Sequence, residues 1–245
     1  GGFGIQVIEK ILKTRGETGQ NDNIRVQAFD TEANEKSIAA SNIEILRFPP
    51  SMKVVLRDRF IPDNKWFPSL EGDFKHFFDD VIGKDQDSIR AAQQTRIFGR
   101  FAFRYNFNTI YRRVFEAFQG FEGTKDRIDV FVAVGLAGGT GSGMFLDFLA
   151  IVRHIAANLQ LAALELHLIL TLGDILYAQL GDARLKRIFD ANSYAALKEL
   201  NYFVQYNNEF RFEVKEAKQT IPLTRAESSP ADYIHLLTYS NHKGF

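Results

Sequence analysis

The 245-residue sequence contains no cysteine at all. A disulfide framework, a cysteine nucleophile and a thiolate metal site are therefore excluded, and a reducing cytosol is compatible with the composition. The chain also lacks an excess of either charge, because 30 Lys and Arg residues balance 30 Asp and Glu residues. Zero net charge disfavours a strongly basic protein that binds nucleic acid.

The sequence also lacks a long hydrophobic run. The longest apolar stretch, residues 159–172, is interrupted by Gln160, Glu165 and His167. A membrane span needs roughly 20 consecutive apolar residues, so none is predicted. No signal peptide follows Gly1, and because the first residue is not Met we expect the chain to be trimmed at its start.

What the chain has in quantity is apolar and aromatic side chains. Apolar residues make up 45% of the sequence and 23 residues are Phe, which suffices for a sizeable core. The length suits one large α/β domain or two small ones. Because no linker or internal repeat marks a boundary, we treat residues 1–245 as a single domain.

Apolar periodicity predicts an alternation of strands and helices. Residues 128–136 form a nearly continuous apolar run, which is typical of a strand covered on both faces. This alternation predicts an α/β fold, with a parallel sheet between two layers of helices. The predicted strands are 24–29, 43–47, 128–136, 164–172 and 233–239, and the predicted helices are 5–13, 74–82, 97–118, 144–157 and 188–206.

The most informative segment is the run AGGTGSG at residues 137–143, which lies between a predicted strand and a predicted helix. Glycines allow unusual backbone conformations and a close approach of ligand to main chain, and a helix start offers unpaired N–H groups. Thr140 and Ser142 add hydroxyl donors. Met144 rules out a P-loop, which needs Lys there, and a dinucleotide fingerprint, which needs Gly. The segment therefore predicts a phosphate cradle rather than a tight turn without a ligand, since four glycines in six residues are costly in chain entropy.

This run resembles the signature [SAG]-GGTG-[SAT]-G of the tubulin and FtsZ GTPases. Further segments resemble parts of that family in the same order. The sequence as a whole most resembles a divergent bacterial group of tubulin-like proteins. These segments are GGFG at 1–4, AFDTE at 28–32, AAQQTR at 91–96 with the following Gly99 and Arg100, NSYAALKEL at 192–200, and Asn241 after the last strand.

The resemblance implies a Rossmann-like domain that binds GTP or GDP with Mg²⁺. Asp30 or Glu32 would orient the magnesium through water, which suits an ion that keeps several waters. The acidic ribose contact matches Asp190, and Asp182 matches equally well. Gly141→Ala or Gly143→Val is expected to abolish binding in a folded protein, because a Cβ would crowd the phosphates. The implied nucleotide-binding residues are Gly1, Gly2, Gly4, Asp30, Thr31, Glu32, Ala92, Gln93, Gln94, Gly138, Gly139, Thr140, Gly141, Ser142, Gly143, Asp190 and Asn241.

The resemblance further implies a cytoplasmic protein that assembles head to tail with copies of itself into filaments. A neighbouring subunit would supply the acidic residue that completes GTP hydrolysis. The family's first strand, its central helix, its hydrolytic loop and its second domain are not found in residues 1–245. The loop at Arg90–Gln94 also lacks the family's Gly-Ala-Gly form. These departures favour an alternative, a scaffold protein that binds nucleotide without hydrolysing it.

Two other features suggest sites. Arg96, Arg100 and Arg104 recur every four residues between phenylalanines, with Arg112 and Arg113 further on. The pattern indicates an amphipathic helix with a solvated basic face, or alternatively a helix that binds nucleic acid. Arg96 is the exception, because it lies where it would reach the nucleotide or a neighbouring subunit.

None of the five histidines forms a pair with metal-ligand spacing, so no protein-bound metal site is predicted. His167 and His235 lie within apolar strand patterns and are expected to be core or edge residues.

Overall fold

The structure is a computed structural model that describes eleven segments of the chain. The described residues are 2–18, 24–32, 43–48, 92, 94–124, 126–161, 163–179, 182–206, 210–214, 219–223 and 229–238. Their helices and strands, in chain order, are α1 (Gly2–Thr18), β1 (Ala28–Asp30), β2 (Ile43–Ile45), α4 (Arg96–Tyr105), α5 (Phe107–Phe118), η3 (Gln119–Phe121), β3 (Ile128–Gly135), α6 (Gly139–Asn158), β4 (Leu164–Thr171), η4 (Gly173–Gln179), α7 (Ala183–Tyr206), β5 (Phe210–Val214), β6 (Gln219–Leu223) and β7 (Tyr233–Leu237).

Parallel strands form the centre of the fold, as the alternating pattern predicts. β3, β4 and β7 lie side by side in that order, with Phe131 opposite His167 and His167 opposite Tyr233. β1 and β2 form a second parallel pair. β5 and β6 pair with each other in an antiparallel hairpin, which the sequence pattern did not predict.

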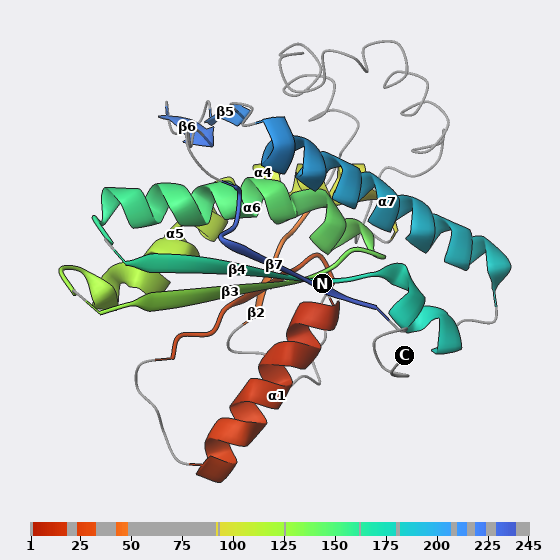
Figure 1. The fold of residues 1–245 in the computed structure, drawn as a ribbon, viewed down its shortest axis with the longest axis horizontal. Helices are drawn as coiled ribbons and strands as arrows, with labels where there is room; N and C mark the ends of the chain where they lie inside the picture. Colours follow the sequence, from red (N-terminus) through yellow and green to blue (C-terminus); the bar gives the residue numbers. More distant parts are fainter. Residues whose placement is uncertain are drawn as a thin grey trace.

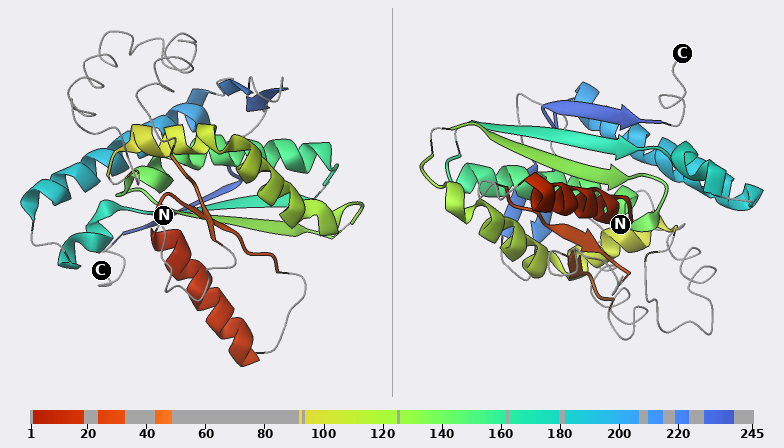
Figure 2. Two further views of the ribbon diagram at one scale, coloured as in Figure 1. Left: turned by 180° about the vertical axis from the view of Figure 1, so that it is seen from behind. Right: turned by 90° about the horizontal axis from the view of Figure 1, so that it is seen from below.

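Helices cover both sides of these strands (Figures 1 and 2). α6 packs over β3 and β4 and is flanked by α4, α5 and α7 on the same side, whereas α1 crosses the opposite side. The predicted α/β fold with parallel strands between helices is therefore confirmed. Among the described helices, none combines the length and apolar character needed to cross a bilayer.

The main core lies between α6 and the central sheet. Leu166, Leu168 and Leu170 alternate along β4 and are fully buried, because side chains at every second strand position point to one face. A smaller cluster joins α1 to the first strand pair through Ile5, Ile8 and Ala28. Ile5 and Ile8 thus lie on the face that α1 buries, whereas Ile11 is exposed.

Several element boundaries differ from the expectation, among them those of the first helix and the first strand. The helix predicted over 97–118 is two helices, because Asn106 interrupts it and its amide binds the backbone oxygens of Arg47 and Ala102. α6 begins at Gly139 rather than Met144, so most of the glycine segment is helical. α7 begins at Ala183, five residues before the expected start. The helix expected over 74–82 lies outside the described residues.

The expectation that β3 is covered on both faces is met along only part of its length. α1 lies over the carboxyl half of β3, where Gly4 approaches the backbone oxygen of Ala133. Near the amino end, Asp129 and Phe131 point to the same side, and Phe131 is 62% exposed in the described structure. We call this exposed part the open face, which consists of the outward-pointing residues of β3, β4 and β7 on the side opposite α6.

Candidate functional site

The candidate nucleotide site lies at the carboxyl edge of the parallel strands. β1 ends at Asp30, β3 ends at Gly135, and each strand is followed by a segment that the sequence marks as a phosphate-binding loop. In open parallel sheets, ligands bind in the crevice beyond these strand ends. The chain therefore brings the predicted segments to the edge where this class of fold places its ligands.

The glycine segment forms the start of α6. Gly138 is the N-cap residue, with φ −85° and ψ 172°, and Gly139 begins the helix. The first amides of a helix have no partner within it and carry the positive end of its dipole, so they form a site for an anion. The hydroxyl of Ser142 binds the carbonyl oxygen of Gly138. Backbone N–H groups, rather than the predicted hydroxyls, are thus the main donors here.

The glycines of this segment are required for close packing. The described residues with positive φ are Gly123 and Gln160, neither of them in the segment, so unusual backbone conformation is not the reason for glycine. A Cβ on Gly139 would lie 2.6 Å from the backbone oxygen of Ala92, and one on Gly143 would overlap the backbone oxygen of Arg96. A Cβ at either position meets protein backbone. A residue larger than glycine at Gly143 would therefore disturb the packing of α4 against α6, in addition to the expected effect on the phosphates.

The start of α1 also lies close to the end of β3, as the start of α6 does. Gly141 packs against the end of β3, as a Cβ added at Gly141 would lie only 2.8 Å from the backbone oxygen of Gly135. From the other side Phe3 of α1 approaches, since a Cβ on Gly135 would lie 3.3 Å from the Cβ of Phe3. The predicted glycine loop around Gly2 and Gly4 is therefore the first turn of α1. The starts of α1 and α6 lie on opposite sides of the end of β3.

Thr31 connects three of the predicted site segments. Its hydroxyl lies 2.7 Å from the hydroxyl of Thr140 and accepts a 3.0 Å hydrogen bond from the backbone N–H of Ala92. Its own N–H donates to the carboxylate of Asp30 over 2.8 Å. All four residues are buried. The loop after β1, the loop at Ala92 and the start of α6 thus form one hydrogen-bonded unit, although they are far apart in sequence.

Asn192 is a site residue that sequence analysis did not single out. Its side-chain amide donates to the backbone oxygens of Gln94 and Ala137, each over 2.8 Å. It therefore joins the Gln94 loop to the residue that precedes the glycine segment. Both acceptors are backbone atoms, so no residue pattern could have revealed the contact. The only sequence signal was the start of the NSYAALKEL segment.

The remaining predicted residues are less closely tied to this unit. Glu32 is exposed beside Thr31. Asp190 is exposed on α7 and lies about 200° around the helix from Asn192, two residues further on. Asp182 precedes α7, and its carboxylate accepts the backbone N–H of Arg184 over 2.7 Å, which explains it as a helix cap. Gly1, Gln93 and Asn241 lie outside the described residues.

Arg96 is partly buried and is held by contacts within the protein. Its guanidinium donates to the backbone oxygen of Ser142 over 2.9 Å and to Glu199 of α7 over 2.6 Å. The side chain is 18% exposed. Arg96 therefore links α4, the start of α6 and α7. It holds the glycine segment in place through the backbone oxygen of Ser142.

The next two arginines of α4 also point inward, which corrects the expected solvated face. Arg100 and Arg104 each lie 2.9 Å from the carboxylate of Asp147, which is buried in α6. Burial lowers the pKa of Arg104 to about 9, although the carboxylate of Asp147 opposes the shift. The arginine remains charged at neutral pH, and the three groups form a buried ionic cluster between α4 and α6.

The arginines of α5 are also paired. Arg113 lies 3.0 Å from Glu44 of β2, and Arg112 lies 3.9 Å from Glu116. The regular spacing of Arg96, Arg100 and Arg104 thus reflects contacts within the protein. Arg112 and Arg113, in contrast, have more exposed side chains and form surface ion pairs. This arrangement gives no support to the alternative in which these residues form a nucleic-acid-binding helix.

The comparison with protein families agrees with this geometry. A family described as tubulin-like matches residues 1–244. Because the match spans nearly the whole chain, the protein belongs to the tubulin-like family. No individual curated protein matches the sequence. The resemblance inferred from the AGGTGSG signature is therefore confirmed at the level of the family.

Proposed function

We propose that this member of the tubulin-like family binds GTP or GDP with Mg²⁺ at the carboxyl edge of its parallel strands. The observation that supports the proposal most directly is the convergence of two helix starts on the end of β3. One of them, at Gly139, bears the family signature. Two positive helix ends at one point favour a multiply charged anion such as a nucleotide phosphate chain.

The donor set fits such a ligand. The unpaired backbone N–H groups at the start of α6, from Gly138 to Gly141, would hold the phosphates, and the loop at Ala92–Gln94 would close over them. Asp30 or Glu32 would orient the magnesium ion through water. When bound, Mg²⁺ neutralises phosphate charge, which is the main requirement of phosphoryl transfer. Asn192 and Thr31 position the loops rather than the ligand. The preference for guanine rests on family membership.

We further propose that copies of the chain assemble head to tail in the cytoplasm and that hydrolysis is completed where two copies meet. A head-to-tail contact that does not close produces a filament. Shared hydrolysis predicts that turnover per subunit rises steeply with protein concentration. The alternative is a scaffold that assembles in response to nucleotide while phosphate release stays at background. Turnover that is measurable but independent of concentration would contradict the shared site.

Equilibrium binding of GTP to the chain with magnesium present is the first test. We expect GDP to displace GTP and ATP to displace it at least tenfold less effectively. Displacement by ATP as readily as by GDP would contradict the guanine assignment while leaving the phosphate site in place. A folded chain that binds neither nucleotide would contradict the whole proposal.

A substitution at the N-cap tests the location of the phosphates. Gly138 has backbone angles open to any residue, and Asp is a favoured N-cap that also suits the helix dipole. Gly138→Asp should therefore keep or raise thermal stability, yet weaken nucleotide binding at least tenfold through repulsion. Gly138→Asn is the matched control, because it caps the helix without a charge. Equal affinities in the two folded variants would place the phosphates elsewhere.

A further inference from the structure

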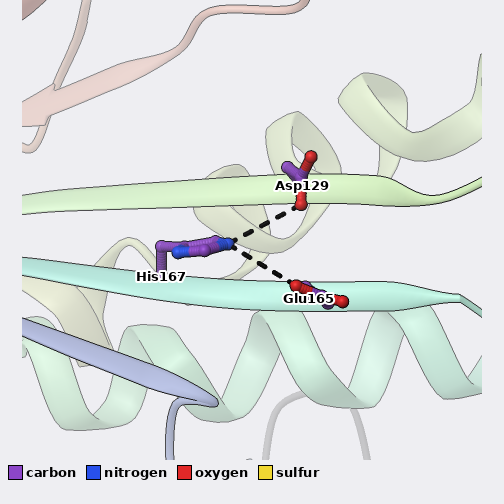
Figure 3. A group of neighbouring side chains, drawn as sticks. All are labelled: Asp129, Glu165 and His167. Carbon is purple, nitrogen blue, oxygen red and sulfur yellow. Dashed lines mark ion pairs between the residues drawn. The ribbon is translucent and has the colours of Figure 1, made fainter.

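A second group of side chains meets on the open face, at the other end of the sheet. Asp129 and Glu165 lie directly opposite each other on β3 and β4, and His167 follows two residues after Glu165. All three point away from α6, because residues two apart in a strand share a face. Figure 3 shows the imidazole directed between the two carboxylates.

The distances suit a shared cation. Nε2 of His167 lies 3.6 Å from Oδ1 of Asp129 and 3.9 Å from Oε2 of Glu165. The three potential ligand atoms lie within 4.8 Å of one another. Zinc bonds of about 2.0–2.2 Å place two tetrahedral ligands about 3.3–3.5 Å apart, so the two distances from His167 exceed this spacing by only a few tenths of an ångström.

The histidine is held in the orientation that a metal ligand needs. Its ring is stacked between Phe131 and Tyr233, with centroid distances of 4.7 and 4.6 Å. Its Nδ1 lies 3.4 Å from Nε2 of His235, which fits the outer contact that fixes the tautomer of a metal-bound histidine. Its Nε2 is buried and has no hydrogen-bond partner among the described residues.

A positive side chain already lies against these carboxylates. Arg127 approaches Asp129 over 2.7 Å and Glu165 over 3.2 Å, and its own side chain is 58% exposed. The hydrogen bond that Arg127 donates to the carboxylate of Asp129 raises the pKa of Arg127. An exposed arginine on a flexible stem can be displaced, because surface ion pairs contribute little to stability.

We propose that Asp129, Glu165 and His167 bind a divalent transition-metal ion of the zinc type, in competition with Arg127. One imidazole and two carboxylates form a borderline donor set that suits zinc and leaves a position for water. His167 would coordinate through Nε2 in its neutral form. This site is separate from the nucleotide site, because it lies near the amino ends of β3 and β4. It does not depend on the proposed nucleotide function.

Zinc titration of the chain against a chromophoric chelator tests the proposal. We expect one zinc ion per chain in the wild type and at least tenfold weaker binding in His167→Gln. Asp129→Asn should weaken binding similarly and provides a second variant if the first does not fold. His154→Gln is the matched control, since His154 lies on α6 away from this face and should leave binding unchanged.

Arg127→Gln separates a metal site from an ordinary ion-pair cluster. If the arginine competes with the metal, its removal should tighten zinc binding several-fold. Cobalt substituted for zinc should then give a visible absorption spectrum in Arg127→Gln that is lost when His167→Gln is added. The proposal would be overturned if the wild type and Arg127→Gln bind no zinc, or if folded His167→Gln binds it as tightly as the wild type.

Discussion

The two ends of the central sheet are built in different ways. At the carboxyl edge, most of the contacts involve backbone atoms. Gly139 and Gly143 allow α4 and the residues before it to approach α6 closely. Hydrogen bonds to main-chain atoms join the loops. Near the amino end of the open face, side chains meet side chains, and Asp129, Glu165 and His167 converge across two strands. The first end presents N–H groups and the second presents carboxylates and an imidazole.

This difference determines which ligands each end can accept. Helix starts and backbone amides favour anions, whereas the cluster of carboxylates and imidazole favours a cation. It also determines how each end should respond to substitution. Changes at the carboxyl edge disturb the packing of whole helices, whereas changes on the open face alter local contacts. The four predictions below test that contrast, from the largest expected effect to the smallest.

The largest effect is expected at the buried ionic cluster behind the carboxyl edge. Asp147→Asn leaves Arg100 and Arg104 without their common carboxylate in a buried environment. We expect unfolding in urea to show a loss of about 3–5 kcal/mol. Glu116→Gln is the control, because it affects only exposed pairs and should cost under about 1 kcal/mol. Equal losses would show that burial does not distinguish these pairs.

Gly143→Ala tests the packing role of the signature glycines. Replacing glycine by alanine inside a helix normally stabilises it by about 1 kcal/mol. Here the new Cβ meets the backbone oxygen of Arg96, so we expect a loss of about 1–3 kcal/mol in thermal or urea unfolding. Gly120→Ala should change stability little, because the nearest atom is 3.9 Å away. A stabilised Gly143→Ala protein would contradict the close approach of α4 and α6.

The pair of threonine hydroxyls tests whether the loops act as one unit. Thr31→Val and Thr140→Val each remove one hydroxyl of the 2.7 Å contact. A double-mutant cycle of unfolding free energies should give a coupling of about 1 kcal/mol. The same cycle measured on nucleotide affinity should also be non-additive, because the two residues hold adjacent loops. Strict additivity in both measurements would mean that the contact is not formed in solution.

The smallest effect is expected on the open face. Phe131 is 62% exposed, so Phe131→Ser should change the free energy of unfolding by about 0.5 kcal/mol. The comparison is Leu168→Ala on the adjoining strand, whose side chain is fully buried on the other face and should cost about 2–5 kcal/mol. A loss of comparable size for Phe131→Ser would show that this face is covered in solution.

Much of the fold could be predicted from periodicity. Nearly continuous apolar runs located β3 and β4, and helical periodicity over residues 5–13 located α1. The break at Asn106 was missed because the amide that interrupts the helix binds the backbone of a distant residue, Arg47. The inward direction of Arg100 was missed because its partner, Asp147, lies 47 residues further on.

The sequence by itself determined the family and the class of fold, and it located the segment at which we propose that a phosphate chain binds. These features depend on residues that are adjacent in the chain, such as AGGTGSG between a strand and a helix. Only the tertiary structure decided which groups meet. It placed Thr31 against Thr140, Asn192 between two loops, and His167 beside the carboxylates of Asp129 and Glu165. The physical reason is that strand register and helix packing set these distances, and both depend on residues far apart in the chain.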